Sequence, residues 1–144
     1  MIVLIQRVNW ARIAIGGETH AEIGKGLLAF VGIERDDGGA ETSRMVDRLL
    51  RYRVFADAEG KMNRDLRAIN GELLLVSQFT LAASTGKGLR PGFSSAKAPP
   101  EAETLFQQMV QTATTRHPAT KSGVFAANMQ ITLENDGPVT FILR

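Results

Sequence analysis

The stretch Gly26-Leu27-Leu28-Ala29-Phe30-Val31-Gly32-Ile33 carries no charged side chain and is almost entirely apolar. A continuous apolar run of about four to eight residues is typical of a strand that is buried on both faces. Leu73-Leu74-Leu75-Val76 is a second run of this kind, and Ile2–Val8 is short and rich in β-branched residues. The three segments predict strands of a sheet, two of which are buried.

The segments around these strands predict further β structure. Ala11–Ile15 and Glu18–Ile23 flank Gly16-Gly17, which is a two-residue signal for a β-hairpin. The tail of the chain alternates between apolar and polar side chains, with one face formed by Phe125, Ala127, Met129, Ile131 and Leu133. Asn135-Asp136-Gly137-Pro138 interrupts this alternation, and Val139–Leu143 is predicted as the last strand.

Two helices are predicted, one from Thr42 to about Arg53 and one from Glu101 to about Thr114. The second has an amphipathic stripe with the spacing of a helix that packs against a core. The stripe consists of Ala102, Leu105, Phe106, Met109, Val110 and Ala113. The acids of the loop Glu34–Gly39 are expected to cap the first helix. Because the chain shows neither a repeat nor a linker, its 144 residues predict a single α+β domain with a mostly antiparallel sheet and two main helices.

Composition narrows the possible functions. Hydrophobic residues make up 44% of the chain and charged residues 22%, which excludes a disordered segment. The chain has no cysteine and only two histidines, His20 and His117, both expected on the solvated surface, so neither thiolate catalysis nor a metal site is expected. The sequence shows no membrane-spanning run and no signal peptide, which predicts a cytoplasmic protein. With a net charge of +2, any nucleic-acid contact must come from a local basic patch.

Few residues have catalytic potential. The paired acids lie in turns, where capping explains them, and no glycine-rich phosphate loop follows a strand. Ser77-Gln78-Phe79-Thr80 follows a buried strand directly, so its hydroxyl, amide and peptide N–H groups can face a cleft, although strand-end capping is the simpler explanation. Ala82–Ala98 is a long loop rich in glycine, proline and serine, of a kind that is usually functional or disordered.

Several segments together make the sequence similar to bacterial D-aminoacyl-tRNA deacylases over essentially its whole length. They are Gln6–Val8, Phe55–Asn63, Ser77–Leu81, Arg90–Phe93, Gly123–Met129 and Asn135–Thr140. The Ser-Gln-x-Thr and Asn-x-Gly-Pro-x-Thr motifs are the most specific, and both are intact. The resemblance implies a homodimer with a barrel-like sheet and no metal or other cofactor. Its implied activity is hydrolysis of the ester between a D-amino acid, or mischarged glycine, and the 3′-terminal adenosine of tRNA.

The resemblance also implies roles for individual residues. Ser77, Gln78, Phe79 and Thr80 form the catalytic segment. Peptide N–H groups near Phe79 and Thr80 are expected to bind the developing oxyanion, while the 2′-hydroxyl of the tRNA helps to activate water. The alternative is that the Thr80 hydroxyl acts as a nucleophile. Gly137-Pro138 is implied to have a cis peptide bond, to enter the active site of the partner subunit and to reject L-aminoacyl esters by collision.

Further contacts with the tRNA are predicted. Phe125 and Met129 are candidates for binding the terminal adenine, with core packing as the equal alternative. Four basic residues are candidates for contacts with phosphates, although a solvated charge is the simpler explanation for each of them. They are Lys87, Arg90, Lys97 and Arg7. The sequence also allows two other functions: a non-catalytic RNA-binding dimer that retains the fold, and a general esterase for small activated esters.

Overall fold

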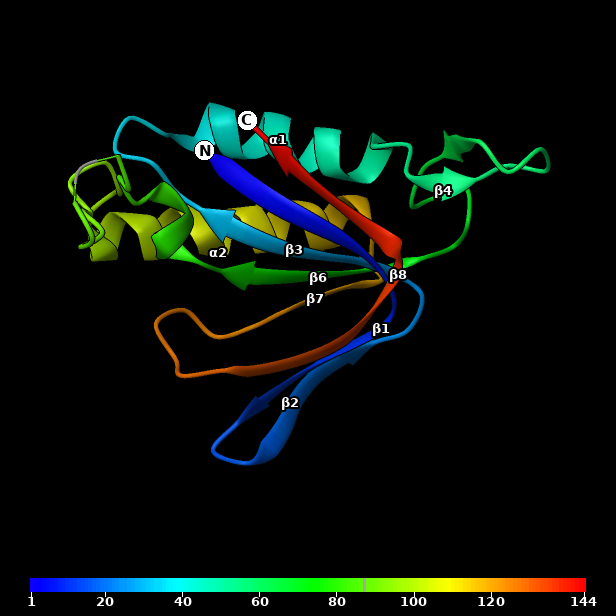
Figure 1. Cartoon of the computed structure of the whole chain (residues 1–144), viewed down its shortest axis with the longest axis horizontal. Coiled ribbons are helices and arrows are strands. Elements are labelled where there is room, and N and C mark those ends of the chain that lie inside the picture. Colours follow the sequence, from blue (N-terminus) through cyan, green and yellow to red (C-terminus); the bar gives the residue numbers. More distant parts are fainter. Residues whose placement is uncertain (87) are drawn as a thin grey trace.

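The computed structural model describes residues 1–86 and 88–144 of the chain. Its long central strand is β1 (Ile2–Ile15), which runs through the middle of a curved sheet (Figure 1). One edge of β1 pairs with β3 (Gly26–Gly32) along its first half and with β2 (Glu18–Ile23) along its second half, in both cases antiparallel. A single strand thus joins the two halves of the sheet.

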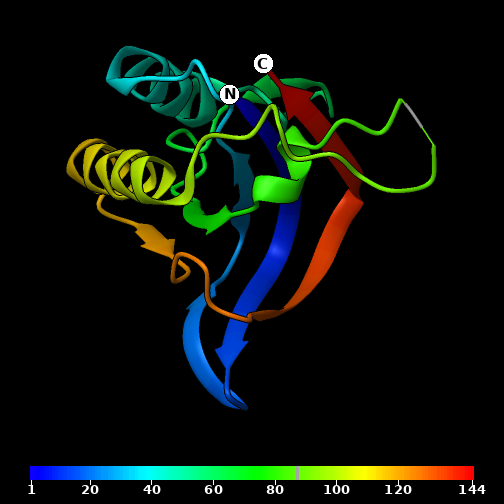
Figure 2. The same ribbon diagram turned by 90° about the vertical axis from the view of Figure 1, so that its left-hand side faces the viewer.

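The rest of the sheet extends from both edges of this strand. β8 (Gln130–Leu143) is antiparallel to β1 and follows its other edge, whereas β6 (Glu72–Ser77) and β7 (Thr120–Ser122) continue in parallel beyond β3. The strands curl into a nearly closed, barrel-like sheet (Figure 2). The predicted α+β fold with a mostly antiparallel sheet is confirmed, with two parallel pairings within it.

Two helices cover one face of this sheet. α1 (Gly39–Arg51) and α2 (Pro99–Arg116) lie side by side against it (Figures 1 and 2). A short 3₁₀ helix, η1 (Phe79–Ala82), follows β6 directly. The strands β4 (Phe55–Ala56) and β5 (Met62–Arg64) form a small separate hairpin beyond α1. The two predicted helices are confirmed, with longer ends at α2 and an earlier start at α1.

The buried character of β3 is confirmed, because its side chains reach two different cores. Leu27, Ala29 and Val31 face the helices and belong to the larger apolar cluster. Leu28 points to the opposite face, where it packs with Leu74 of β6 and other residues of a second cluster. A strand that is covered on both sides needs apolar side chains at successive positions, which explains the continuous run in the sequence.

The N-terminal hairpin is confirmed, but β1 is one strand rather than two. Gly16 and Gly17 have φ values of 60° and 86°, the conformation that a tight two-residue hairpin turn requires. The predicted break between Ile2–Val8 and Ala11–Ile15 appears instead as two irregularities in the pairing of β1 with β8.

The prediction that the tail becomes a strand at Phe125 is wrong. Residues 123–129 form an irregular segment in which Ala126 has a φ of 59°. A residue with positive φ cannot continue a strand, so the apolar and polar alternation before Gln130 has no strand behind it. The Asn135–Pro138 segment shifts the register of β8 against β1 without ending the strand, since Gln6 pairs with Thr140 and Val8 with Asn135.

Two smaller predictions are also corrected. The acids of the loop before α1 do not cap the helix, because the Asp37 carboxylate accepts the backbone N–H of Glu34. Glu41, in the first turn of α1, instead accepts the backbone N–H of Gly38. His117 is buried rather than solvated, and its Nε2 lies 2.8 Å from the carbonyl oxygen of Gly71. No helix in the part of the chain that the structure describes is long and apolar enough to cross a membrane.

Candidate active site

The Ser77–Thr80 segment leaves the sheet at the end of β6 and turns into η1. The backbone N–H of Gln78 donates to the carbonyl oxygen of Val31 at 2.7 Å, which joins the start of this segment to β3. Gly32, the next residue of β3, lies directly under η1. A Cβ atom at Gly32 would stand 2.8 Å from Cβ of Leu81 and 3.2 Å from the carbonyl oxygen of Gln78. The absence of a side chain at Gly32 therefore sets how closely η1 approaches the sheet.

This turn exposes polar and aromatic groups together. The Gln78 side-chain amide donates to the Thr80 hydroxyl at 2.6 Å. The Phe79 side chain is 57% exposed, and its ring packs at a tilt against Phe93 with 5.0 Å between centroids. Within the described residues, the backbone N–H groups of Phe79 and Thr80 have no acceptor, because these residues open the 3₁₀ turn. The prediction that free N–H groups lie at this strand end agrees with that arrangement.

The second predicted segment is a tight turn within β8, at the point where the register of this strand shifts against β1. Its Gly137-Pro138 bond is cis, and both residues are exposed. The Asn135 side chain spans the turn, since its Oδ1 accepts the N–H of Val139 at 2.9 Å and its Nδ2 donates to the Thr140 hydroxyl at 3.1 Å. The side chain of Asn135 thus fixes the turn from within, which gives the first residue of the Asn-x-Gly-Pro-x-Thr motif a structural role.

Arg7 of β1 also holds the Asn135–Pro138 turn. Its Nε donates to the backbone carbonyl oxygen of Asp136 at 3.0 Å and lies 3.1 Å from the carboxylate of that residue, while Nη1 donates to the carbonyl oxygen of Val54 at 2.6 Å. Its side chain is only 14% exposed. The structure therefore contradicts the prediction that Arg7 is available to tRNA phosphates. Its role in the turn was missed because its partners are distant in the sequence.

The two predicted segments do not meet within one chain. No hydrogen bond or ion pair joins Ser77–Thr80 to Gly137-Pro138 in the described residues. The bend of β8 and η1 lie well apart in Figure 1. Within one chain the two segments are thus separate features of the surface.

Phe125 and Met129 are not brought together either. Phe125 is partly buried against the larger core, and its ring lies 6.3 Å from that of Phe106 between centroids. It lines a hollow of about 390 Å³ between α2 and the segment after β7. Met129 belongs to the second core and packs on Gly123, where a Cβ atom would lie 2.6 Å from its sulfur. Phe125 keeps access to a cleft, whereas Met129 is mainly a packing residue.

The predicted phosphate contacts of the long loop are only partly available. The Lys97 ammonium donates to the carbonyl oxygen of Arg35 at 2.5 Å and lies 3.5 Å from Glu101, with 11% of its side chain exposed. Arg90 is exposed, and Lys87 lies outside the described residues. The described part of the loop is tied back on itself by paired backbone bonds between Ser84 and Gly92.

The described residues contain no group of three or more side chains suited to hold a metal ion. The Ser77–Thr80 turn offers peptide N–H groups, a hydroxyl, an amide and exposed aromatic rings. Such groups can bind and polarise an activated carbonyl, because peptide N–H donors stabilise the oxyanion that forms when water attacks it.

Comparison with known proteins agrees with this chemistry. Residues 4–144 match the family model described as D-Tyr-tRNA(Tyr) deacylase. A D-aminoacyl-tRNA deacylase of Pseudomonas paraeruginosa is 54% identical over 144 residues, which cover 100% of this chain and 99% of that protein.

Solved structures confirm the fold. The structure of a c-Myc DNA Unwinding Element Binding Protein is similar with a TM-score of 0.95 and 35% identity, covering 100% of this chain and 98% of the other. A structure described as a probable eukaryotic D-amino acid tRNA deacylase has a TM-score of 0.89 at 14% identity, covering 99% of this chain and 97% of the other, and shows the shared fold alone. The family model and the Pseudomonas paraeruginosa relative place the chain among hydrolases that act on the ester bond of aminoacyl-tRNA. The chain belongs to the D-Tyr-tRNA(Tyr) deacylase family.

Proposed function

We propose that this protein hydrolyses the ester that joins a D-amino acid to the 3′-terminal adenosine of tRNA, and that it acts in the cytoplasm, where aminoacyl-tRNA is made. The observation that carries the proposal is the exposed turn after β6, which offers the free N–H groups of Phe79 and Thr80 beside an aromatic pair. A strand end of this kind, in a chain of this family, suits an ester that is already labile and needs positioning more than a strong protein nucleophile.

We propose that water attacks the ester with help from the 2′-hydroxyl of the terminal ribose. The N–H groups of Phe79 and Thr80 would bind the oxyanion that forms, and one such donor is typically worth about 10²–10³ in rate. The proton of the attacking water leaves through the RNA or solvent, and the products are free D-amino acid and tRNA.

The contacts of Thr80 argue against its hydroxyl as the nucleophile. A hydroxyl becomes a good nucleophile when an adjacent base accepts its proton. The only side chain bonded to the Thr80 hydroxyl among the described residues is the amide of Gln78, and an amide is not a base at neutral pH. Gln78 is better suited to orient the hydroxyl toward bound substrate.

We propose that a second copy of the chain supplies the chiral filter. Gly137-Pro138 is exposed and lies away from η1 in its own chain, so in a homodimer it is available to the site of the other subunit. A rigid turn there would collide with the side chain of an L-aminoacyl ester, whereas a D side chain would point elsewhere and glycine would pass. Exposed Ile142, just beyond the turn on β8, adds apolar surface for such a dimer.

The hollow beside Phe125 is the proposed place for the terminal adenine. Its volume of about 390 Å³ falls within the size range of small-molecule sites, and an aromatic ring on its wall offers a stacking surface for a base.

The activity test compares three charged tRNAs and one small ester. Hydrolysis of D-Tyr-tRNA and Gly-tRNA, with L-Tyr-tRNA and a small aryl ester left largely intact, is the expected result. Equal loss of D-Tyr and L-Tyr would refute chiral editing. Binding of tRNA without hydrolysis of any of these substrates would support the non-catalytic module instead.

The mechanism is tested separately with a Thr80→Ala variant and with tRNA that lacks the terminal 2′-hydroxyl. Hydrolysis assisted by RNA predicts that Thr80→Ala retains substantial activity and that the deoxy substrate loses most of it. The opposite pattern would establish Thr80 as the nucleophile. Thr19→Ala, an exposed substitution in β2, serves as the matched control.

A further inference from the structure

The outer face of α1 carries a row of arginines. Arg44, Arg48 and Arg51 are spaced four and three residues apart, which places them on one stripe of the helix, and Arg53 follows just past its end. All four are exposed. The opposite face of α1 is buried in the larger core, so this orientation is fixed. The four residues are called the arginine row below.

Few acids neutralise this row. Glu41 is paired with Arg44 and also accepts the N–H of Gly38, whereas Asp47 is held at 2.9 Å by Arg116. Among the described residues, Arg51 and Arg53 have no acidic partner. The row thus presents at least two unpaired cations.

Asp65 is the remaining acid near the end of the row, and its carboxylate accepts the backbone N–H of Ala68. Arg48 occupies the middle of the row, where its guanidinium lies 5.9 Å from the centre of the Tyr52 ring and donates to the carbonyl oxygen of Arg144. The Tyr52 ring supports this cation, and because its guanidinium already bonds the backbone of Arg144, Arg48 is not counted among the unpaired cations of the row.

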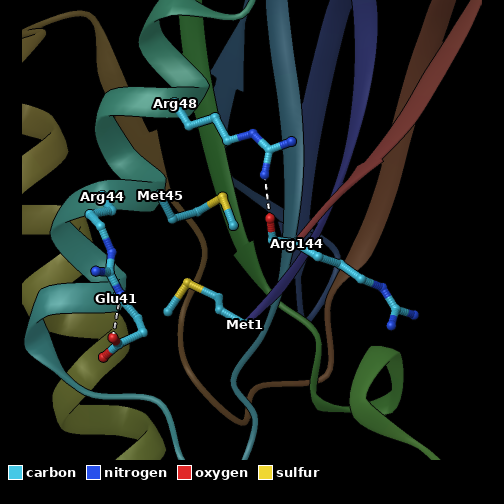
Figure 3. Close-up of a pocket in the computed structure, with 6 residues that line it drawn as sticks. All are labelled: Met1, Glu41, Arg44, Met45, Arg48 and Arg144. Atoms are coloured by element: carbon cyan, nitrogen blue, oxygen red, sulfur yellow. Dashed lines mark hydrogen bonds and ion pairs between the residues drawn. The ribbon is translucent and has the colours of Figure 1, made fainter.

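Two hollows follow the row on either side of Arg48. One, of about 350 Å³, lies between α1 and the ends of β1 and β8 and is floored by Met1 and Met45 (Figure 3). In Figure 3, Arg48 reaches across this hollow toward Arg144. The other hollow, of about 590 Å³, is lined by Arg48, Arg51 and Arg53 together with Tyr52 and two acids. Arg48 borders both hollows, so they lie one after the other along α1; the two hollows and the arginine row together are called the basic groove.

We infer that this groove binds the phosphodiester backbone of the tRNA stem, away from the reacting 3′ end. From Arg44 to Arg51 the helix rises about 10 Å, which spans several phosphates of a duplex strand. The basic residues in this part of the chain are all arginines, and guanidinium groups bind phosphate through two parallel hydrogen bonds. A-form RNA is recognised mainly through its backbone, so contacts of this type suit a substrate whose stem sequence varies.

The inference rests on the proposed function, because the 3′ end must reach the turn after β6 while the stem extends across the outer surface. α1 begins on the side of the molecule that holds η1 and ends beside β4, so the arginine row leads away from the candidate site along the outer surface (Figure 1). The chain as a whole is only weakly basic, which makes a local row of cations the place where a polyanion would bind.

The experiment compares the double variant Arg51→Gln/Arg53→Gln with the matched control Arg12→Gln/Lys25→Gln. Both remove two exposed positive charges whose side chains have no ion-pair partner among the described residues. Binding of uncharged tRNA is measured by fluorescence anisotropy from about 50 to 200 mM salt. Hydrolysis of a short substrate, D-Tyr esterified to adenosine, is measured alongside it.

Loss of two phosphate contacts makes the slope of log K against log salt shallower by about 1.8. The ratio of wild-type to variant affinity for tRNA therefore shrinks about tenfold between about 50 and 200 mM salt. The control is expected to keep the wild-type slope, and both variants are expected to hydrolyse the short substrate at the wild-type rate. An unchanged slope in the Arg51/Arg53 variant would overturn the inference, as would equal losses in the control. Loss of activity on the short substrate would also overturn it, because that substrate has no stem.

Direct measurement of tRNA binding separates this inference from the proposed function. Suppose that the salt dependence of tRNA binding changes with the arginine row but that the wild-type protein does not hydrolyse D-Tyr-tRNA. The proposed function then fails, while the binding groove stands. A second variant, Arg48→Gln/Arg51→Gln, is expected to show the same change in the salt dependence of tRNA binding. Wild-type affinity and salt dependence in both double variants would refute the proposal that this groove binds tRNA.

Discussion

Replacement of Gly32 by alanine tests how the candidate site is positioned. The new Cβ atom would lie 2.8 Å from Cβ of Leu81, 3.2 Å from the carbonyl oxygen of Gln78 and 3.4 Å from the backbone nitrogen of Ala82. All three atoms belong to η1 or to the residue before it, and none is the end of a flexible side chain. The methyl group can be accommodated only if this whole turn moves away from β3.

Overpacking of this kind typically costs about 1–3 kcal/mol of stability. For Gly32→Ala, part of that cost falls on the turn itself, so the N–H groups of Phe79 and Thr80 shift from the carbonyl they are proposed to bind. A shift of about 1 Å can lower the rate about 10²-fold. We therefore expect a lower urea midpoint together with a loss of kcat/KM on D-Tyr-tRNA that exceeds what the unfolded fraction explains.

The matched control is Gly39→Ala. A Cβ atom at Gly39 would lie 3.7 Å from the side-chain oxygen of Gln108, an ordinary contact, at the first position of α1. Alanine there is expected to change stability by less than about 1 kcal/mol, with no effect on activity. If Gly32→Ala retains both the wild-type urea midpoint and the wild-type kcat/KM, close packing of η1 on β3 does not position the site.

Three further predictions concern stability. Hydrogen bonds from the Asn63 side chain, and then from backbone N–H groups, hold the pKa of the Asp57 carboxyl below its ordinary value. The contribution of Asp57 to folding stability is therefore present above the ordinary pKa and is lost as the pH falls through the lowered pKa. Asp57→Ala should reduce the urea midpoint at pH 7 and have little effect on it at strongly acidic pH. His117→Phe leaves the buried carbonyl of Gly71 without its side-chain partner and should cost about 1–3 kcal/mol in chemical unfolding. Phe106→Ala removes a buried ring between α2 and the sheet and should cost about 3–5 kcal/mol, visible as a large drop in Tm.

The parts of the fold that sequence predicted correctly are those set by local pattern. β3 and β6 are buried on both faces, so their apolar runs mark them directly. Gly16-Gly17 fixes a hairpin because few other residues adopt two successive positive φ values. The pattern was misleading at Phe125 to Met129, because alternation in the sequence does not reveal the positive φ of Ala126.

The parts that sequence could not predict depend on partners far along the chain. Nothing near His117 indicates that the carbonyl of Gly71 will meet its ring, so a polar context suggested solvent. Arg7 was likewise expected to be either a solvated charge or a phosphate contact, although its guanidinium is bonded to Asp136 and Val54. Long-range hydrogen bonds of this kind arise only when strands pair, and they leave no periodic signal in the sequence.

The two segments of the candidate site are held by different pairs of strands. The turn after β6 rests on β3 through Gly32, whereas Gly137-Pro138 rests on β1 through Arg7 and on its own strand through Asn135. Because each segment is fixed independently, a substitution under one of them leaves the other in place. If the proposed dimer brings them together, damage to the first should lower hydrolysis of D- and L-aminoacyl esters alike, and damage to the second should change the ratio between them. The ratio of the two rates therefore reports which of the two segments a distant substitution has moved.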